Sequence, residues 1–147
     1  MAKIQLIVGS VMGTAASVAK TLSEKLQAAG HTTRVNDAFR KGDLSEDDEI
    51  LLICTSNTGA GDLPVNIVPL YLHLRNDFPN ISTRRYGIVN LGDSSYPTFA
   101  QAGNHMDEAF QDLGANRIGD MLVIDALSGE DPNSVAETWL ADWIQLL

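Results

Sequence analysis

The chain has 147 residues, of which 44% are hydrophobic and 20% charged, a composition typical of a globular protein rather than a disordered or fibrous one. The formal net charge of −9 disfavours nucleic-acid binding, because an acidic surface repels phosphates. The single cysteine, Cys54, excludes an internal disulfide and a cysteine-rich metal cluster, which favours a reducing compartment.

The charge is unevenly distributed along the chain. Residues 1–42 contain six Lys or Arg and two Asp or Glu, whereas residues 43–147 contain four and seventeen. An acidic surface of this kind can steer a basic partner, although acids that only keep the protein soluble explain the charge equally well. There is neither a signal-peptide pattern nor an apolar run of the roughly 18 residues that a membrane helix needs. We therefore expect one domain over residues 1–147, a monomer, and a cytoplasmic location without membrane contact.

The first half of the chain alternates between β-prone runs and one amphipathic helix. Lys3–Gly9 is rich in Ile and Val and is typical of a buried strand. Apolar residues then recur at helical spacing over Val18–Leu26, and Gly30 supplies a left-handed stop. Thr32–Asn36 is short and β-prone. Ile50–Thr55 is a solid apolar run that predicts a central parallel strand.

The second half continues this alternation. Pro69 fits the first turn of a helix that runs to about Asp77, and Arg85–Leu91 is the next predicted strand. A helix with apolar spacing ends at Gly114, and Arg117–Ile124 predicts a further strand. Asp131 followed by proline is a good N-cap and first-position pair for the final helix.

The last helix carries an apolar residue at every fourth position. Val135, Trp139, Trp143 and Leu147 form this repeat, which predicts a buried seam. We interpret both tryptophans as core residues, with stacking on a cofactor as the alternative.

Five strands that alternate with helices through short connections predict a doubly wound parallel sheet with helices on both faces. In such sheets, ligands bind beyond the carboxyl ends of the strands, where the strand order reverses. The candidate site therefore narrows to the loops that follow the first, third and fourth predicted strands.

The loop Gly9–Ala15 connects a strand to a helix. Its glycines allow a tight turn, its N–H groups converge at the helix N-terminus, and Ser10 and Thr14 add hydroxyls, which favours an anion site and most simply a phosphate site. No Lys-Ser/Thr pair follows Gly13, which excludes an NTPase loop, and the three-glycine dinucleotide fingerprint is also missing. A plain tight turn is the alternative interpretation.

The other two loops suit a flat ligand. In Cys54–Pro64, small residues and two glycines permit a close approach to the backbone, whereas the thiol of Cys54 itself is predicted to be buried and inert. In Leu91–Phe99, Tyr96 stands beside Asp93 and two serines, and its ring can stack on a heteroaromatic ring. A tyrosine folded back into the core is the alternative.

Three motifs in these loops carry a resemblance to a known family. Gly-Ser-x-x-Gly-Thr at 9–14, Thr-Gly-Ala-Gly-Asp-Leu-Pro at 58–64 and Leu-Gly-Asp-Ser-Ser-Tyr-x-x-Phe at 91–99 follow in the order and spacing of short-chain flavodoxins. The chain resembles that family over essentially its whole length, most of all the small YqcA/MioC-like branch. The resemblance implies an α/β flavodoxin-like three-layer sandwich, with a five-stranded parallel sheet in the order 2-1-3-4-5.

The resemblance also implies a bound FMN. The first loop would hold its phosphate, residues 56–61 would line one face of the isoalloxazine ring, Tyr96 would cover the other face, and the backbone around Asp93 would meet the pyrimidine edge. Gly59 matches the glycine whose carbonyl turns toward the flavin N5 when that nitrogen is protonated. The predicted cofactor-binding residues are Ser10, Val11, Met12, Gly13, Thr14, Ala15, Ser56, Asn57, Thr58, Gly59, Ala60, Gly61, Leu91, Gly92, Asp93, Tyr96 and Phe99.

The chain departs from the family pattern at four positions. Met12 and Ala15 stand where many flavodoxins have threonines, which removes hydroxyl donors to the phosphate. Thr58 replaces a frequent aromatic residue or histidine, and Ala100 replaces a common cysteine. These departures predict that FMN binds, but more weakly.

No side chain in the three loops is an obvious acid, base or nucleophile, so the cofactor is expected to carry the chemistry. The resemblance implies an electron-transfer protein rather than an enzyme: a one-electron carrier that docks transiently, through its acidic face, with a basic reductase and an acceptor enzyme. One alternative is an FMN-dependent reductase that acts directly on small acceptors. Another is an interaction module without flavin, for which Met12 and Ala15 are the motivation.

Overall fold

The computed structural model describes residues 2–10, 13–45, 48–56, 63–92 and 100–147. Within these segments all strand pairs are parallel, and the order β2-β1-β3-β4-β5 confirms the predicted 2-1-3-4-5 arrangement, with β6 also paired to β4. The strands are β1 (Lys3–Gly9), β2 (Thr32–Asn36), β3 (Glu49–Ser56), β4 (Arg85–Gly92), β5 (Asn116–Arg117) and β6 (Leu122–Asp125).

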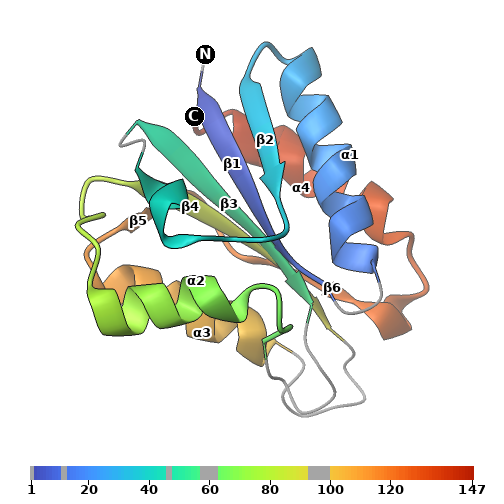
Figure 1. Ribbon diagram of the computed structural model, residues 1–147. Coiled ribbons are helices and arrows are strands. Elements are labelled where there is room, and N and C mark those ends of the chain that lie inside the picture. Colours follow the sequence, from blue (N-terminus) through green and yellow to red (C-terminus); the bar gives the residue numbers. More distant parts are fainter. Residues whose placement is uncertain (1, 11–12, 46–47, 57–62, 93–99) are drawn as a thin grey trace.

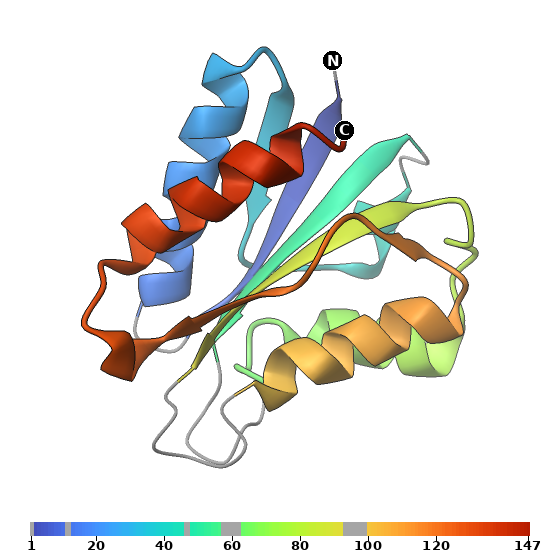
Figure 2. The same cartoon turned by 180° about the vertical axis from the view of Figure 1, so that it is seen from behind.

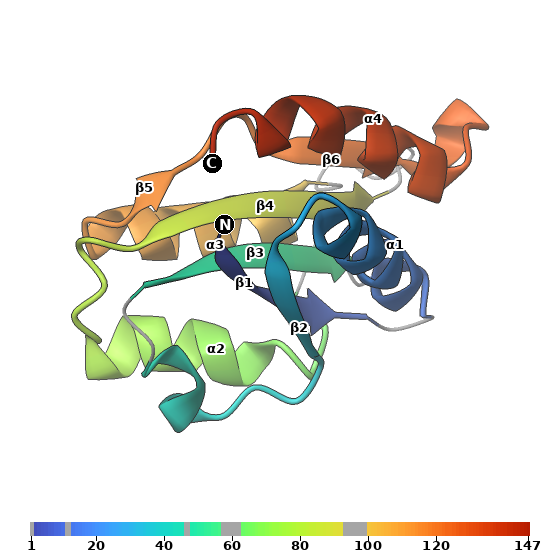
Figure 3. The ribbon, with the colours of Figure 1, turned by 90° about the horizontal axis from the view of Figure 1, so that it is seen from above.

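Helices cover both faces of the sheet. Helices α1 and α4 lie on one face, and α2 and α3 lie on the other (Figures 1, 2 and 3). None of the helices in the described segments is long and apolar enough to cross a membrane. The helices are α1 (Thr14–Ala28), α2 (Val68–Leu72), α3 (Gln101–Asp112) and α4 (Pro132–Ile144), with one π-helical turn η2 (His73–Asp77) and the 3-10 turns η1 (Lys41–Leu44) and η3 (Ala126–Ser128).

The sheet separates two apolar cores. Successive side chains of β1 point to opposite faces, so Leu6 packs beneath α1 and α4 whereas Ile7 packs beneath α2 and α3. Trp143 of α4 is only 2% exposed and lies directly on Gly87 of β4. A Cβ atom at Gly87 would lie 2.9 Å from the indole ring, so this close approach requires glycine.

Several sequence predictions are confirmed residue by residue. The bounds of β1 and β2 are those predicted, and Gly30 has a φ of 93°, the left-handed conformation expected just beyond α1. The side chain of Asp131 accepts a hydrogen bond from the N–H of Asn133, as expected of an N-cap.

The predicted strand Arg117–Ile124 is instead two short strands, β5 and β6, at the same edge of the sheet. Gly119 between them has a left-handed φ of 66°. The neighbouring carbonyls accept from α4, because Trp143 Nε1 donates to Ile118 O at 3.0 Å and Trp139 Nε1 donates to Asp120 O at 3.2 Å. The ladder with β4 stops after the N–H of Ile118, which donates to Tyr86 O at 2.7 Å, and resumes at Leu122 beyond the left-handed Gly119.

The seam predicted on α4 also needs correction. Trp143 is a core residue as predicted, but Val135, Trp139 and Leu147 are only partly buried. The fully buried positions are Ala136 and Leu140 together with Trp143, because the helical period of 3.6 moves a strict four-residue repeat off the buried face.

The helix predicted from Pro69 to Asp77 changes form midway. It begins at Val68, with proline in the first turn as expected, and its second half is the π-helical turn η2. It ends at Phe78, which has a left-handed φ of 48° and a side chain that is 70% exposed.

Candidate functional site

The carboxyl ends of β1, β3, β4 and β6 lie side by side at one edge of the sheet. Gly9 is in register with Thr55, Ser56 with Leu91, and Gly92 with Asp125. The three loops that the sequence singled out therefore begin next to one another, as parallel strands require (Figure 1).

The first of these loops leads into an open helix N-terminus. The hydroxyl of Ser10 accepts a hydrogen bond from the N–H of Gly13 at 2.8 Å, and Gly13 precedes α1 in a left-handed conformation with φ 86°. No side chain of the described residues caps α1, and its first turn contains no acidic residue. The first N–H groups of α1 and the positive end of its dipole therefore fit an anion such as a phosphate.

The predicted phosphate-loop residues differ in what they can offer. Gly13 and Thr14 are exposed and Ser10 is half-buried, so all three lie at the surface of this edge. Ala15 is fully buried in the core beneath α1, so only its backbone faces the loop. Val11 and Met12 lie outside the described residues.

At the ends of β3 and β4, the described part of the site is mostly backbone. Ser56 is half-buried, and its hydroxyl lies 3.5 Å from Gly9 O, to which it donates. Leu91 is 8% exposed and belongs to the core, whereas Gly92 is half-buried. The remaining predicted residues lie outside the described residues, and their roles stay predictions: Asn57, Thr58, Gly59, Ala60, Gly61, Asp93, Tyr96 and Phe99.

Sequence reasoning missed Asn66, which lies between the second loop and α2. Its Oδ1 accepts from the N–H of Ser10 at 3.0 Å, and its Nδ2 donates to Val8 O at 3.1 Å and to Asp37 O at 3.2 Å. No local signal marks this residue, because its partners are 29 to 58 positions away along the chain.

Beneath this edge, Cys54 is completely buried in β3, and burial raises the pKa of its thiol to about 12. The thiol is therefore protonated at neutral pH and inert, as predicted from the sequence. Within the part of the chain that the structure describes, no three His, Cys, Asp or Glu side chains gather as metal ligands.

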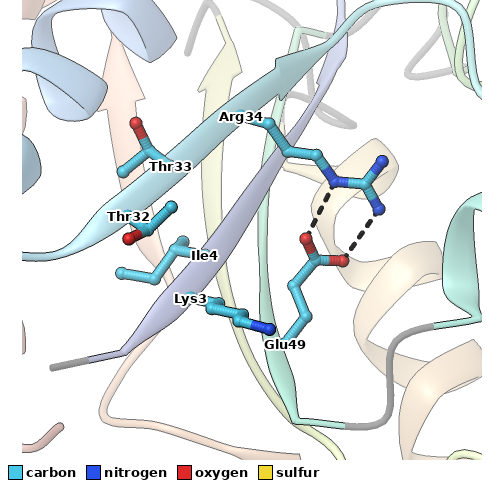
Figure 4. A pocket seen from close by; sticks show the side chains of 6 residues that line it. All are labelled: Lys3, Ile4, Thr32, Thr33, Arg34 and Glu49. Carbon is cyan, nitrogen blue, oxygen red and sulfur yellow. Dashed lines mark hydrogen bonds and ion pairs between the residues drawn. The ribbon is translucent and has the colours of Figure 1, made fainter.

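A hollow of about 290 Å³ lies near the amino ends of β1, β2 and β3 (Figure 4). Its charged groups already have partners, because Arg34 donates to both carboxylate oxygens of Glu49 at 2.8 and 3.0 Å and Lys3 pairs with Asp48 at 3.5 Å. The carboxyl edge therefore remains the candidate site. The hollow is lined by Lys3, Ile4, Thr32, Thr33, Arg34 and Glu49.

These features define a doubly wound α/β protein with an anion-compatible loop at the carboxyl edge of its sheet. Comparison with known proteins places the chain more narrowly. The flavodoxin family model matches residues 6–139. The chain belongs to the flavodoxin family.

Individual relatives match over almost their whole length. The chain is similar to flavodoxin YqcA of Pectobacterium carotovorum subsp. carotovorum, with 39% identity over 100% of this chain and 98% of that protein. It is equally similar to protein MioC of Escherichia coli strain K12, with 39% identity over 100% and 99%. Among solved structures, a cysteine-to-serine mutant of flavodoxin from Pseudomonas aeruginosa has 36% identity and a TM-score of 0.91, covering 99% of this chain and 98% of that one.

Proposed function

We propose that this chain binds FMN at the carboxyl edge of its sheet and carries single electrons from a reductase to acceptor enzymes. The observation that carries the proposal is the N-terminus of α1 beyond the end of β1, which no side chain of the described residues caps, in a chain of the flavodoxin family. The same proposal includes one domain over residues 1–147 that acts as a monomer in the cytoplasm.

In this proposal, different residues of the chain bind the phosphate and the flavin ring of FMN. Ser10, Gly13 and Thr14, with backbone N–H groups of the loop, bind the phosphate. Residues 56–61 line one face of the flavin ring and Tyr96 lies against the other. When bound, FMN supplies reversible one-electron redox chemistry, and the protein supplies binding, orientation and electrostatics.

The charge of the chain supports a transient docking partner. The net charge of −9 favours a reductase and an acceptor with basic surfaces, since opposite charges raise association rates. At 0.1 M ionic strength, salt largely screens exposed charges that are more than roughly 10 Å apart. Electron transfer from the reductase should therefore slow as salt is added.

The most direct test is a titration of the purified protein with FMN, followed by flavin absorbance and fluorescence. We expect saturable binding of one FMN per chain, and reduction of the bound flavin by a reductase in a salt-sensitive step. A protein that takes up no FMN at any reasonable concentration would contradict the proposal. Steady oxidation of NAD(P)H by the purified flavoprotein alone would indicate that the chain is a reductase rather than an electron carrier.

A further inference from the structure

The side chain of Asn66 joins three backbone segments. Asn66 is half-buried at the start of the segment that leads into α2, and it bonds to both sides of Gly9 in β1 as well as to Asp37, which follows β2. All three partners are backbone groups, so Asn66 can constrain the path of the chain rather than the rotamer of one side chain.

The geometry reproduces a parallel strand pair. In such a pair, one residue donates to the carbonyl of residue i−1 and accepts from the N–H of residue i+1 on the neighbouring strand. Asn66 donates to Val8 O and accepts from Ser10 N–H, so its carboxamide meets β1 opposite Gly9 as the N–H and C=O of one strand residue would. β2 pairs with β1 only as far as Ile7, and Asn66 thus continues the ladder where β2 has ended.

Packing at the same point supports this arrangement. Ile67, the residue after Asn66, is fully buried against Gly9. A Cβ atom at Gly9 would lie 2.7 Å from Ile67 Cγ2 and 2.8 Å from Thr55 Oγ1, so the two segments approach as closely as glycine allows. The amide of Asn66 and the side chain of Ile67 therefore both fix the position of the carboxyl end of β1.

A short chain of hydrogen bonds leads from Asn66 to α1. Asn66 Oδ1 accepts from Ser10 N–H at 3.0 Å, and Ser10 Oγ accepts from Gly13 N–H at 2.8 Å. Gly13 directly precedes the first turn of α1, whose N–H groups have no side-chain cap within the part of the chain that the structure describes. The position of these open N–H groups therefore depends on where Asn66 holds the backbone of Ser10.

We propose that Asn66 is a positioning residue for the phosphate of the cofactor, acting through the backbone of Ser10. This inference rests on the proposed function for its ligand. Asn66 itself bonds only to backbone groups in the described structure. It acts by fixing the backbone of Ser10, in the loop Gly9–Ala15 that follows β1, before the ligand binds.

The test compares Asn66→Ala with Asn36→Ala as a matched control. Asn36 also makes three hydrogen bonds, to Gln5, Asp43 and the N–H of Ala38, but none of them reaches the β1 loop. Dissociation constants are measured for FMN and for riboflavin, which lacks the phosphate, with the fold verified by circular dichroism and urea unfolding. Amide hydrogen exchange at Ser10 and Gly13 is measured in the protein without flavin.

We expect Asn66→Ala to raise the FMN dissociation constant by about tenfold or more, with a clearly smaller factor for riboflavin, and to speed exchange at Ser10. Asn36→Ala should lower the unfolding midpoint but leave FMN binding within about twofold, since none of its three hydrogen bonds reaches Ser10 or Gly13. Combined with Ser10→Ala, the Asn66→Ala loss should be smaller than in the wild type, because the hydrogen bonds of Ser10 to Asn66 and to Gly13 form one chain. If Asn66→Ala does not fold, Asn66→Leu, which is close in size but has neither the donors nor the acceptor, should show the same selective loss.

Three results would overturn the inference. They are equal FMN affinity in Asn66→Ala and Asn36→Ala, equal factors for FMN and riboflavin, and unchanged exchange at Ser10. Failure of the proposed function is distinguishable from these, because a wild-type protein that takes up no FMN would still report through Ser10 exchange whether Asn66 positions the loop.

Discussion

The polar groups near the two ends of β1 differ in whether other groups of the protein satisfy their hydrogen bonds. Beside its amino-terminal half, Gln5 is completely buried, yet its Nε2 donates to Glu49 Oε1 at 2.8 Å and to Asp43 O at 2.9 Å. At its carboxyl end, Gly13 leads into a helix whose first turn has no cap among the described residues. Polar groups that satisfy one another contribute to folding, whereas groups left open at a surface are available to a ligand.

The closed end has a structural reason. In the described part of the connection from β2 to β3, the one helical element is the 3-10 turn η1, and polar side chains of the sheet bond to that turn directly. Asn36 Nδ2 donates to Gln5 Oε1 and to Asp43 Oδ2, both at 2.8 Å, and Arg34 donates to Glu49. This network takes the place that an apolar helix face would fill.

The largest effect should come from removing the centre of that network. Glu49 is 4% exposed and accepts from both Arg34 and Gln5, so Glu49→Ala removes its three hydrogen bonds and leaves Asp43 O as the acceptor that Gln5 and Arg34 still share. We expect a loss of about 3 kcal/mol in the free energy of unfolding, measured by urea denaturation. FMN affinity of the folded variant should stay unchanged, and a parallel loss of affinity would show that the two ends are coupled.

Two glycines at close approaches sharpen the contrast. Gly9→Ala places a Cβ atom against Ile67 at the site, and Gly87→Ala places one against Trp143, far from the β1 loop. Each should lower the free energy of unfolding by about 1–3 kcal/mol through overpacking. Only Gly9→Ala should also raise the FMN dissociation constant, because Ile67 adjoins Asn66. Equal FMN affinities in the two variants would mean that packing at β1 does not shape the site.

The contrast between the ends also explains what the sequence could predict. Local signals located β1, β2 and the N-cap Asp131, because each depends on neighbouring residues. The order of loops at the carboxyl edge followed from strand and helix alternation alone.

Other features depend on partners far away in the chain. The break between β5 and β6 is set by indoles of α4, which lie 19 and 25 positions beyond the carbonyls that they bind. The sequence around Asn66 indicates only a loop residue, and its contacts with Val8 and Ser10 in the folded chain reveal its place at the site. The apolar repeat of α4 misplaced the buried face for a different reason, since a strict four-residue repeat drifts around a helix of 3.6 residues per turn and only Trp143 of the repeat is fully buried.

A second matched pair isolates backbone conformation from packing. Gly13 and Gly129 both have a left-handed φ, 86° and 76°, and a Cβ atom at either would touch none of the described residues within 4 Å. Substitution by alanine should therefore cost about 1 kcal/mol of stability at each position, from backbone strain alone. Gly13→Ala should raise the FMN dissociation constant by up to about tenfold, and Gly129→Ala should not. Similar FMN titrations for both variants would remove the turn at Gly13 from the phosphate site.

The smallest expected effect is the pH dependence of the closed end. Burial tends to raise the pKa of Asp43, but the N–H of Arg40 and the side chain of Asn36 outweigh it, so the pKa of this carboxyl lies below its ordinary value of 3.8. A lowered pKa in the folded state contributes stability above that value, and the contribution is lost as the pH falls through the folded pKa. Because Asp43 is partly exposed, the contribution should stay below about 1 kcal/mol.

Asp43→Asn tests this sign in urea unfolding without FMN. The stability difference between wild type and variant should be present at neutral pH and shrink as the pH drops below 3.8. Asn36→Ala removes one of the two bonds that lower the pKa and should reproduce part of this loss. FMN affinity at neutral pH should be the same in all three proteins, because this carboxylate is satisfied by its own neighbours. A stability difference that grows in acid would contradict this prediction, because it would mean that the folded protein favours the protonated carboxyl of Asp43. Asp43 Oδ2 would then act as a donor, whereas in this structure it accepts from Asn36 and from the N–H of Arg40.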